Sequence, residues 1–186
     1  MGDVFDGIDA QLQAWIERQH VFFVATAPRG DDGFVNCSPK GLDSLRVLDP
    51  HTVAYLDLTG SGVETIAHLK ENGRIAVMLC AFDGPPRIVR LNGRGTVVHP
   101  GDRDFDALVA RFPRQLGVRC VIRIALTRIS DSCGYAVPLM SFVAEREALT
   151  KWSQKKGVDG VVEYQRENNA KSLDGLTGVD WLADGR

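Results

Sequence analysis

The chain has 186 residues, of which 22 are basic and 24 are acidic, giving a formal net charge of −2. With about 150 residues to a typical domain, this length predicts one domain over residues 1–186 with a sizeable core. Hydrophobic residues make up 44% and charged residues 25%, which excludes a disordered or collagen-like chain. The small net charge argues against nucleic acid as a partner, and no apolar run reaches the ~18 residues of a membrane helix.

Cysteine and histidine are scattered along the chain. The cysteines are Cys37, Cys80, Cys120 and Cys133. They form no C-x-x-C pair, so we expect reduced, structural thiols. The histidines have neither H-x-x-x-H nor H-E-x-x-H spacing, and we predict no metal site. The N-terminus is acidic and has no apolar segment typical of a secretory signal, so we expect a cytoplasmic protein.

The first part of the chain predicts a helix followed by a hairpin. Apolar residues recur at helical spacing over residues 9–19, and Asp9 precedes them as a capping residue. Residues 21–26 are apolar on both faces and rich in β-branched and aromatic side chains, which is typical of a buried strand. After a turn, residues 34–38 predict the returning strand, which Pro39 ends.

The middle of the chain predicts mostly strands. They are expected at residues 51–58, 75–81, 87–99 and 118–128. Short helices are expected at residues 63–72 and 102–112, and a further helix at 145–156, before mixed turns over 157–186. Glycines at 93 and 95 interrupt the long strand, which is typical of a bulge, a barrel corner or the close approach of another group. In the last strand, alternation puts Arg119 on a polar face. Because strands do not alternate regularly with helices, a mainly β fold with a small antiparallel barrel is favoured over a doubly wound sheet.

A glycine-rich corner, residues 59–62, joins a predicted strand to a predicted helix. Free backbone N–H groups and the positive end of the helix dipole make such a corner a natural anion site. Ser61 and Glu64 also have the spacing of a capping box, which would only satisfy the amides of the helix itself. The sequence leaves both interpretations open. It contains neither a Walker lysine nor a G-x-G-x-x-G pattern here, so a P-loop and a Rossmann fingerprint are excluded.

Two other groups of residues are candidates for binding an anion. Lys40 lies at a strand end beside Ser38, where it could contact a phosphate or an electron-rich ring; a solvated lysine is the alternative. Arg90 and Arg94 share strand parity and would give a positive face, for which surface ion pairs are the alternative. The hydrolase pattern G-x-S-x-G is missing.

The order of these motifs resembles the pyridoxamine 5′-phosphate oxidase-like family of FMN-binding split barrels. The matching segments are residues 22–26, 39–43, 55–62, 65–74, 82–87 and 90–95. The resemblance covers roughly residues 12–135 and implies a six-stranded antiparallel split barrel with short flanking helices. The barrel core would span about residues 20–135, preceded by the helix at 9–19 and followed by a C-terminal extension at about 139–186.

The resemblance also implies a function and a site. It implies an FMN-dependent oxidoreductase that acts on a small molecule, as a homodimer with the cofactor at the interface. The family lysine matches Lys40, and Asn36 and Ser38 precede it as ring or ribityl contacts. The cofactor-binding residues implied are Asn36, Ser38, Lys40, Asp57, Thr59, Gly60, Ser61, Gly62, Thr65 and Arg90.

Several positions depart from the family pattern. Val35 stands where true pyridoxamine phosphate oxidases carry an arginine, and Glu64 and Thr65 stand where they carry basic residues. The closing tryptophan and arginine motif is missing as well. These departures argue against the formation of pyridoxal phosphate and remove charged partners for a phosphate. The alternatives are a non-catalytic carrier of flavin, deazaflavin or haem, and a barrel whose cofactor site has decayed. No catalytic acid or base is predicted; Tyr135 is more plausibly a buried structural residue than a proton donor.

Overall fold

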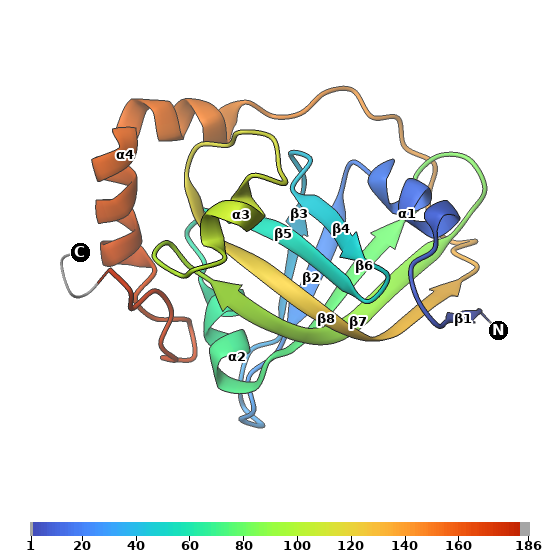
Figure 1. Cartoon of the computed structure of the whole chain (residues 1–186), viewed down its shortest axis with the longest axis horizontal. Helices are drawn as coiled ribbons and strands as arrows, with labels where there is room; N and C mark the ends of the chain where they lie inside the picture. The colour runs from blue at the N-terminus through green and yellow to red at the C-terminus, as the bar shows by residue number, and fades with distance from the viewer. Residues whose placement is uncertain (1, 183–186) are drawn as a thin grey trace.

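The computed structural model describes residues 2–182 as a mainly β structure with four helices (Figure 1). The strands are β1 (Val4–Phe5), β2 (Phe22–Thr26), β3 (Asn36–Lys40), β4 (Leu45–Asp49), β5 (Thr52–Leu58), β6 (Arg74–Cys80), β7 (Ile88–Val98) and β8 (Val118–Ser132). The helices are α1 (Ala10–Glu17), α2 (Glu64–Asn72), α3 (Phe105–Val109) and α4 (Ala148–Asn168). Among the described residues, no helix is both long and apolar enough to span a membrane.

The strands form one curled antiparallel sheet in the order β3-β2-β6-β7-β8-β5-β4, and β1 pairs with β8. The predicted mainly β, antiparallel fold is therefore confirmed. The predicted count of six strands is wrong, because the sheet contains eight strands in residues 2–182 and is not closed. The two strands without a counterpart in the sequence analysis are β1 and β4. The arrangement is compatible with a split barrel.

Strand β3 lies at one end of the sheet and begins later than predicted. Pro39 does not end it; the residue pairs opposite Phe23 within the strand. A proline has no N–H to donate, and an edge strand tolerates this because one of its sides has no neighbour. The buried face of β2 therefore sets the register of β3, and Asn36, Ser38 and Lys40 turn inward while Cys37 and Pro39 stay exposed.

Long strands β7 and β8 form the most extensive pair of the sheet. Their register shifts between Asn92 and Gly93, which confirms the predicted bulge, and a Cβ at residue 93 would collide with the carbonyl of Ala125. Strand β8 continues to Ser132 instead of ending at 128. The polar face predicted for β8 is wrong at its start, because Arg119 is only 3% exposed.

The helices differ from prediction mainly at their ends. The side chain of Asp9 caps α1 by accepting a hydrogen bond from the N–H of Leu12 at 2.7 Å, as predicted. The capping box at Ser61 and Glu64 does not form, because α2 begins after Val63 with no side-chain cap. Gly73 ends α2 in the left-handed conformation, with φ 70°, as its position predicts. Helix α3 is shorter than the predicted 102–112.

The C-terminal extension is more ordered than predicted. Helix α4 runs to Asn168, with a break at Gly157, where φ is 69° and ψ is 174°. The predicted helix end near this glycine is thus correct locally, but a second helical stretch follows it because Val161 and Gln165 become buried. Figure 1 shows residues 133–147 crossing from the end of β8 to α4 on the opposite side of the barrel.

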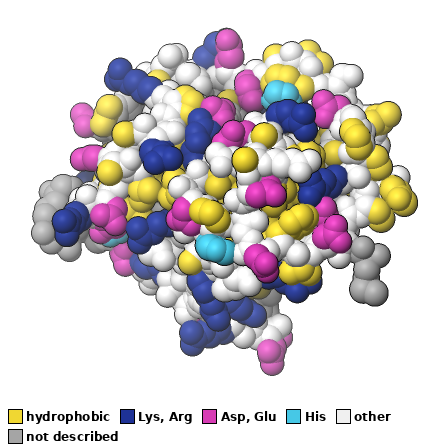
Figure 2. Space-filling model, turned by 45° about the vertical axis from the view of Figure 1, so that its right-hand side comes forward, with side chains coloured by type: hydrophobic (Ala, Val, Ile, Leu, Met, Phe, Trp, Pro, Cys, Tyr) yellow, Lys and Arg dark blue, Asp and Glu magenta, His cyan; other side chains and the backbone are white. Residues whose placement is uncertain are grey.

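The main core fills the inside of the curled sheet. Its fully buried members include Val24, Tyr55, Leu79, Leu91 and Ile122. A second cluster lies on the other side of β5 and β8, where α3 covers them. Acidic and basic side chains are interspersed over the face shown in Figure 2, in keeping with the small net charge.

Candidate functional site

Polar side chains bridge the gap between strand β3 and helix α2. The amide of Asn36 donates to the hydroxyl oxygens of Thr26, at 3.2 Å, and Thr65, at 3.0 Å. The hydroxyl of Ser38 donates to the side-chain oxygen of Asn36 at 2.9 Å. The structure thus brings together three of the residues that the resemblance implies, Asn36, Ser38 and Thr65. Their polar atoms already satisfy one another.

A buried ion pair lies beside this network and joins β3, β5 and β8. Asp57 accepts a hydrogen bond from Nε of Arg119 at 2.7 Å, and its other oxygen lies 3.6 Å from Nζ of Lys40. Burial raises the pKa of Asp57, but the charges of Arg119 and Lys40 outweigh it and hold that pKa below its usual value. Asp57 therefore stays ionised and holds the Lys40 ammonium at the end of β3.

Arg119 is the residue of this group that the sequence analysis missed. It also donates to the carbonyl of Gly62 at 2.9 Å, so it connects the ion pair to the glycine-rich corner. The sequence could have pointed to a cation at this place, because Asp57 interrupts an otherwise apolar strand, β5, and a buried carboxylate requires a positive partner. The hydroxyl of Tyr55 and one oxygen of Asp57 have no hydrogen-bond partner within residues 2–182. Burial raises the pKa of Tyr55 well above its usual value, so that hydroxyl remains neutral.

The C-terminal extension contacts the glycine-rich corner through two side chains. Thr59 donates to the carbonyl of Gly117 and accepts a hydrogen bond from the amide of Gln165 at 2.7 Å. The buried amide of Asn169 donates to the carbonyl of Gly60 at 3.0 Å. These bonds use the Thr59 hydroxyl and the backbone carbonyl of Gly60, whereas Gly60, Ser61 and Gly62 themselves are exposed. The contact of the corner with a phosphate therefore stays a prediction.

A second carboxylate, which belongs to the extension, lies between helix α2 and the residues that precede β3. Asp174 accepts a hydrogen bond from the N–H of Phe34 at 3.0 Å, and one of its oxygens lies 3.2 Å from Nε2 of the buried His68. The other ring nitrogen of His68 lies 3.0 Å from the hydroxyl of Thr26. The Phe34 N–H, helped by His68, holds the pKa of Asp174 below its usual value despite partial desolvation. This negative charge disfavours a phosphate nearby.

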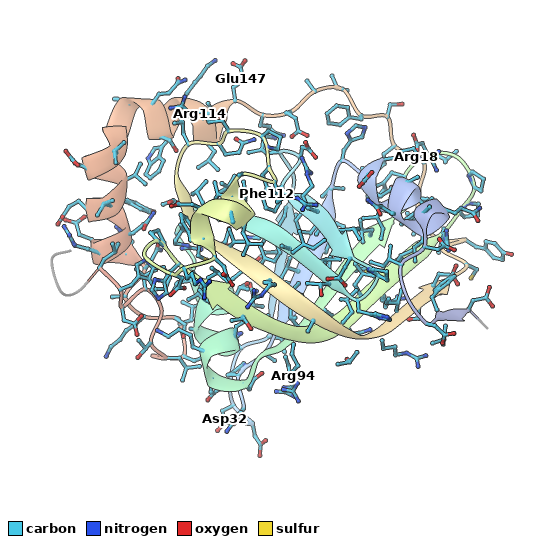
Figure 3. The ribbon with its side chains drawn as sticks, viewed as in Figure 1. Arg18, Asp32, Arg94, Phe112, Arg114 and Glu147 are labelled. Atoms are coloured by element: carbon cyan, nitrogen blue, oxygen red, sulfur yellow. The ribbon has the colours of Figure 1, made fainter. Side chains whose placement is uncertain are left out.

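The arginines of β7 do not join Lys40. Arg90 lies on the outer face of the sheet, where it donates to the hydroxyl of Ser132 at 2.9 Å. Arg94 donates to the carbonyl of Asn72, and Figure 3 shows Arg94 near α2 and Arg18 near α1, on opposite sides of the barrel. Arg90 and Arg94 therefore each make a separate local contact, and they do not act together as the positive face that strand parity predicts.

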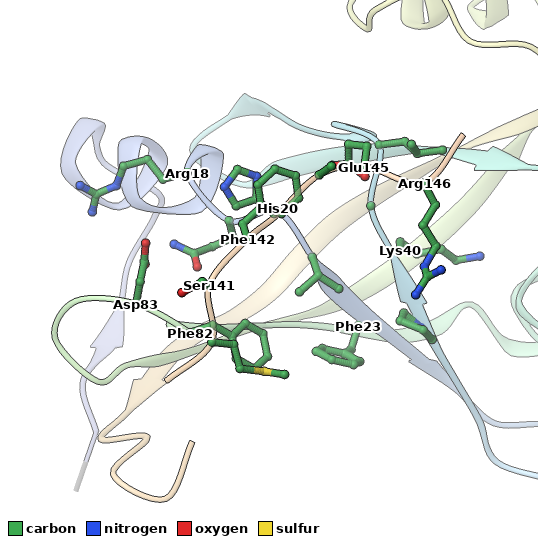
Figure 4. Close-up of a pocket in the computed structure, with 17 residues that line it drawn as sticks. Arg18, His20, Phe23, Lys40, Phe82, Asp83, Ser141, Phe142, Glu145 and Arg146 are labelled. Carbon is green, nitrogen blue, oxygen red and sulfur yellow. The ribbon is translucent and has the colours of Figure 1, made fainter. Parts of the chain in front are cut away.

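A cavity of about 560 Å³ opens next to Lys40. Its floor is the outer face of β2 and β3, and its roof is the segment of residues 139–146, which we call the strap. Lys40 is the one residue of the implied set that lines the cavity. Figure 4 shows Phe23, Phe82 and Phe142 in its middle, with Lys40 and Arg146 at one end and Arg18 and Asp83 at the other.

The strap and the cavity have few polar contacts. The N–H of Met140 donates to the carbonyl of Phe82 at 2.8 Å. The ring of Phe142 stacks on His20, with centroids 3.7 Å apart and planes 10° from parallel.

Tyr135, which precedes the strap, is 82% exposed, so the expectation that it is a buried structural residue is wrong. The described residues contain no group of metal-ligating side chains, and all four cysteines are free.

Comparison with known proteins assigns the chain to a family. The family model for pyridoxamine 5′-phosphate oxidase matches residues 8–133. A relative from Aspergillus flavus, the pyridoxamine 5′-phosphate oxidase family protein ustO, is 40% identical over 193 residues, which cover 94% of this chain and 77% of ustO. The chain belongs to the pyridoxamine 5′-phosphate oxidase family.

Solved structures share the family fold at lower identity. A variant of HupZ from Group A Streptococcus has a TM-score of 0.52 and 23% identity, over 67% of this chain and 99% of that chain. A protein of Lactobacillus delbrueckii has a TM-score of 0.52 and 19% identity, over 69% of this chain and 98% of that chain. The match to the family model ends at residue 133, so the strap and α4 lie beyond it.

Proposed function

We propose that this member of the pyridoxamine 5′-phosphate oxidase family binds FMN and is an oxidoreductase that acts on a small molecule. The observation that carries the proposal is the cavity beside Lys40. Its volume of about 560 Å³ lies within the range of roughly 300–1,000 Å³ typical of small-molecule sites, and aromatic side chains line its middle. Family membership supports a flavin as the cofactor.

The residues of the site fit the ring of a flavin better than its phosphate. The flat, largely apolar ring suits the cavity, where Phe23 and Phe82 offer aromatic surface and Lys40 offers a positive charge. The phosphate suits the glycine-rich corner less well, because the carboxylate of Glu64 lies beside Gly62 there. Asn36, Ser38, Thr65 and the corner thus remain predicted contacts, with support chiefly for Lys40.

The chemistry would be divided between the cofactor and the chain. A bound flavin supplies hydride transfer, while the protein binds, orients and shields it. Lys40 would contribute a fixed positive charge, because its ammonium is held by Asp57, which is itself held by Arg119. The strap would keep bulk water away from the cavity. No side chain of the cavity stands out as a catalytic acid or base.

Absorption spectroscopy tests the proposal. The purified protein is mixed with FMN, freed of excess by desalting, and scanned in the visible range. We expect the wild type to retain the flavin bands. Lys155→Ala, which changes an exposed lysine outside the cavity, should retain them too. Lys40→Ala should retain less flavin, so its bands should be weaker. A wild type that never retains flavin would refute the proposal. Anaerobic reduction by NADH or NADPH then separates an oxidoreductase from a carrier, and the same titration with deazaflavin or haem tests the alternative ligands.

We also propose a homodimer in a reducing, cytoplasmic setting. Phe34 and Val35 are 63% and 75% exposed next to the edge strand β3, and such adjacent apolar side chains favour burial in an interface. Free thiols at all four cysteines suit a reducing compartment. Light scattering should give twice the chain mass for the wild type and one chain mass for Val35→Asp.

A further inference from the structure

A continuous series of side-chain hydrogen bonds, which we call the relay, joins the C-terminal extension to the inner face of β3. The carboxylate of Asp174 lies 3.2 Å from Nε2 of His68, whose Nδ1 lies 3.0 Å from the hydroxyl of Thr26. The amide of Asn36 donates to that hydroxyl at 3.2 Å, and its oxygen accepts from the hydroxyl of Ser38 at 2.9 Å. The relay therefore connects the barrel to a residue that lies beyond the family match.

The direction of the bonds in the relay follows from Asp174. A carboxylate only accepts hydrogen bonds, and Asp174 accepts from the N–H of Phe34 at 3.0 Å and from His68. Nε2 of the buried His68 therefore carries a proton. The hydroxyl of Thr26 already accepts from Asn36, so Nδ1 of His68 is the group within residues 2–182 that can take its proton. The ring of His68 thus donates at Nε2 and accepts at Nδ1.

The same direction reaches Ser38. Both protons of the Asn36 amide are used, one toward Thr26 and one toward Thr65, so its oxygen faces Ser38. Ser38 gives its one hydroxyl proton to that oxygen and keeps its own lone pairs as acceptors. It is half-buried on the inner face of β3, which it shares with Lys40. This face therefore offers a hydrogen-bond acceptor at Ser38 and a cationic donor at Lys40.

An isosteric substitution at Asp174 should invert the relay. In Asp174→Asn the side-chain oxygen keeps its bond to the backbone N–H that precedes β3, because an NH2 group cannot accept that bond. The NH2 group then faces Nε2 of His68 and donates to it, which leaves the ring proton on Nδ1. Thr26 accepts from His68 and gives its own proton to the oxygen of Asn36. The Asn36 NH2 group turns to Ser38, which changes from an acceptor to a donor.

We infer that Asp174 is a positioning residue that acts through His68 to fix Ser38 as a hydrogen-bond acceptor, and that a ligand on the inner face of β3 presents an N–H or O–H group to Ser38. The inference rests on the proposed function in taking this face as part of the ligand site. Because Asp174 belongs to the extension, the extension determines which hydrogen-bonding group of a ligand this strand accepts.

Nitrogen NMR of the histidine rings in the ligand-free, full-length protein tests the direction of the relay, since it distinguishes a protonated ring nitrogen from an unprotonated one. His68 is the buried histidine, and the variants His20→Gln, His51→Gln and His99→Gln identify its signals by removing the other three in turn. We expect the proton on Nε2 in the wild type and on Nδ1 in Asp174→Asn. Asp32→Asn, which changes an exposed acid outside the relay, should keep the wild-type pattern.

The Asn36 amide shows whether the change reaches β3. Its NH2 protons should give nuclear Overhauser effects to the methyl groups of Thr26 and Thr65 in the wild type, and to the β-protons of Ser38 in Asp174→Asn. An unchanged ring in Asp174→Asn, or a changed ring without a turned amide, would overturn the inference. The wild-type spectrum decides the direction even if that variant does not fold, because a proton on Nδ1 in the wild type contradicts it.

Fluorescence titration with FMN gives a separate readout at the ligand. Asp174→Asn should weaken FMN binding about tenfold, or about 1.4 kcal/mol, even though it removes a negative charge, because Ser38 then presents a donor to a donor. Asp32→Asn should bind FMN like the wild type. Unchanged or tighter binding by Asp174→Asn would overturn the acceptor role of Ser38. A wild type that does not bind FMN would overturn the proposed function, whereas the NMR result would still decide the relay.

Discussion

Replacing Arg119 with methionine should produce a large, pH-dependent loss of stability. The substitution removes the 2.7 Å hydrogen bond to Asp57 and the 2.9 Å bond to the carbonyl of Gly62. The Asp57 side chain is 1% exposed, and Lys40, at 3.6 Å and without a hydrogen bond, would be its remaining charged neighbour. Removing one partner of a buried ion pair costs about 3–5 kcal/mol, a large share of the roughly 5–15 kcal/mol that stabilises a domain.

The direction of the pH effect follows from Asp57. In the wild type its folded-state pKa lies below 3.8, so its stabilising contribution is present above about pH 4 and is lost as the pH falls further. Without Arg119, burial dominates and should raise that pKa above 3.8. The contribution of the group is then lost as the pH rises from 3.8. The difference in unfolding free energy between wild type and variant should therefore be largest near pH 7 and smaller near pH 4.5.

Urea unfolding followed by circular dichroism at pH 7 and pH 4.5 measures this difference. The double variant Asp57→Asn with Arg119→Met is the control, because it leaves no buried carboxylate and the Lys40 side chain, 22% exposed, can reach water, so it should recover part of the loss at pH 7. It also keeps the test informative if the single variant fails to fold at neutral pH. A loss below about 1 kcal/mol, or an equal loss at both pH values, would refute the reasoning.

Three further predictions concern the backbone and the extension. Gly73→Ala should lower the free energy of unfolding in urea by about 1–2 kcal/mol, because φ is 70° at this residue. The control Gly160→Ala, in a helical conformation, should change it by less than about 1 kcal/mol. Equal effects would contradict the role of the left-handed turn. Asn169→Ala removes the buried amide that caps the glycine-rich corner and should cost about 1–3 kcal/mol in the same assay, and an unchanged midpoint would argue that water replaces it. Phe142→Ala should speed tryptic cleavage at Arg146 in the folded protein, because the strap loses its stacking on His20; an unchanged rate would show that the strap does not depend on that contact.

The sequence predicts most of the barrel because its strands have strong local signals. Alternating or fully apolar runs identify β2, β5, β6, β7 and the core of β8. The edges of the sheet are harder, because β3 takes its register from β2 and tolerates Pro39 within the strand. Only the first half of helix α4 is predicted, because Gly157 and Gly160 have low helix propensity; the second half is helical because Val161 and Gln165 pack against the barrel.

The residues of the candidate site, too, could be predicted only where local sequence motifs carry them. Asn36, Ser38, Lys40 and Asp57 could be singled out because motifs close in sequence carry them, and the structure brings them to one side of the barrel. The cavity could not be predicted, since it exists only where the strap, about 100 residues after β3, folds back over it. The same holds for Asp174 and His68, whose contact joins residues 106 positions apart.

The long-range closure of the glycine-rich corner has a consequence for biosynthesis. Gln165 and Asn169 satisfy polar groups in a corner that is synthesised 106 to 109 residues earlier. While the chain emerges from the ribosome, the barrel can form its strand pairs, but Thr59 remains without Gln165, and His68 without Asp174, until those residues have also emerged. These contacts must therefore form after the barrel strands have been synthesised, and chains interrupted before Gln165 would leave the buried hydroxyl of Thr59 without the amide that pairs with it.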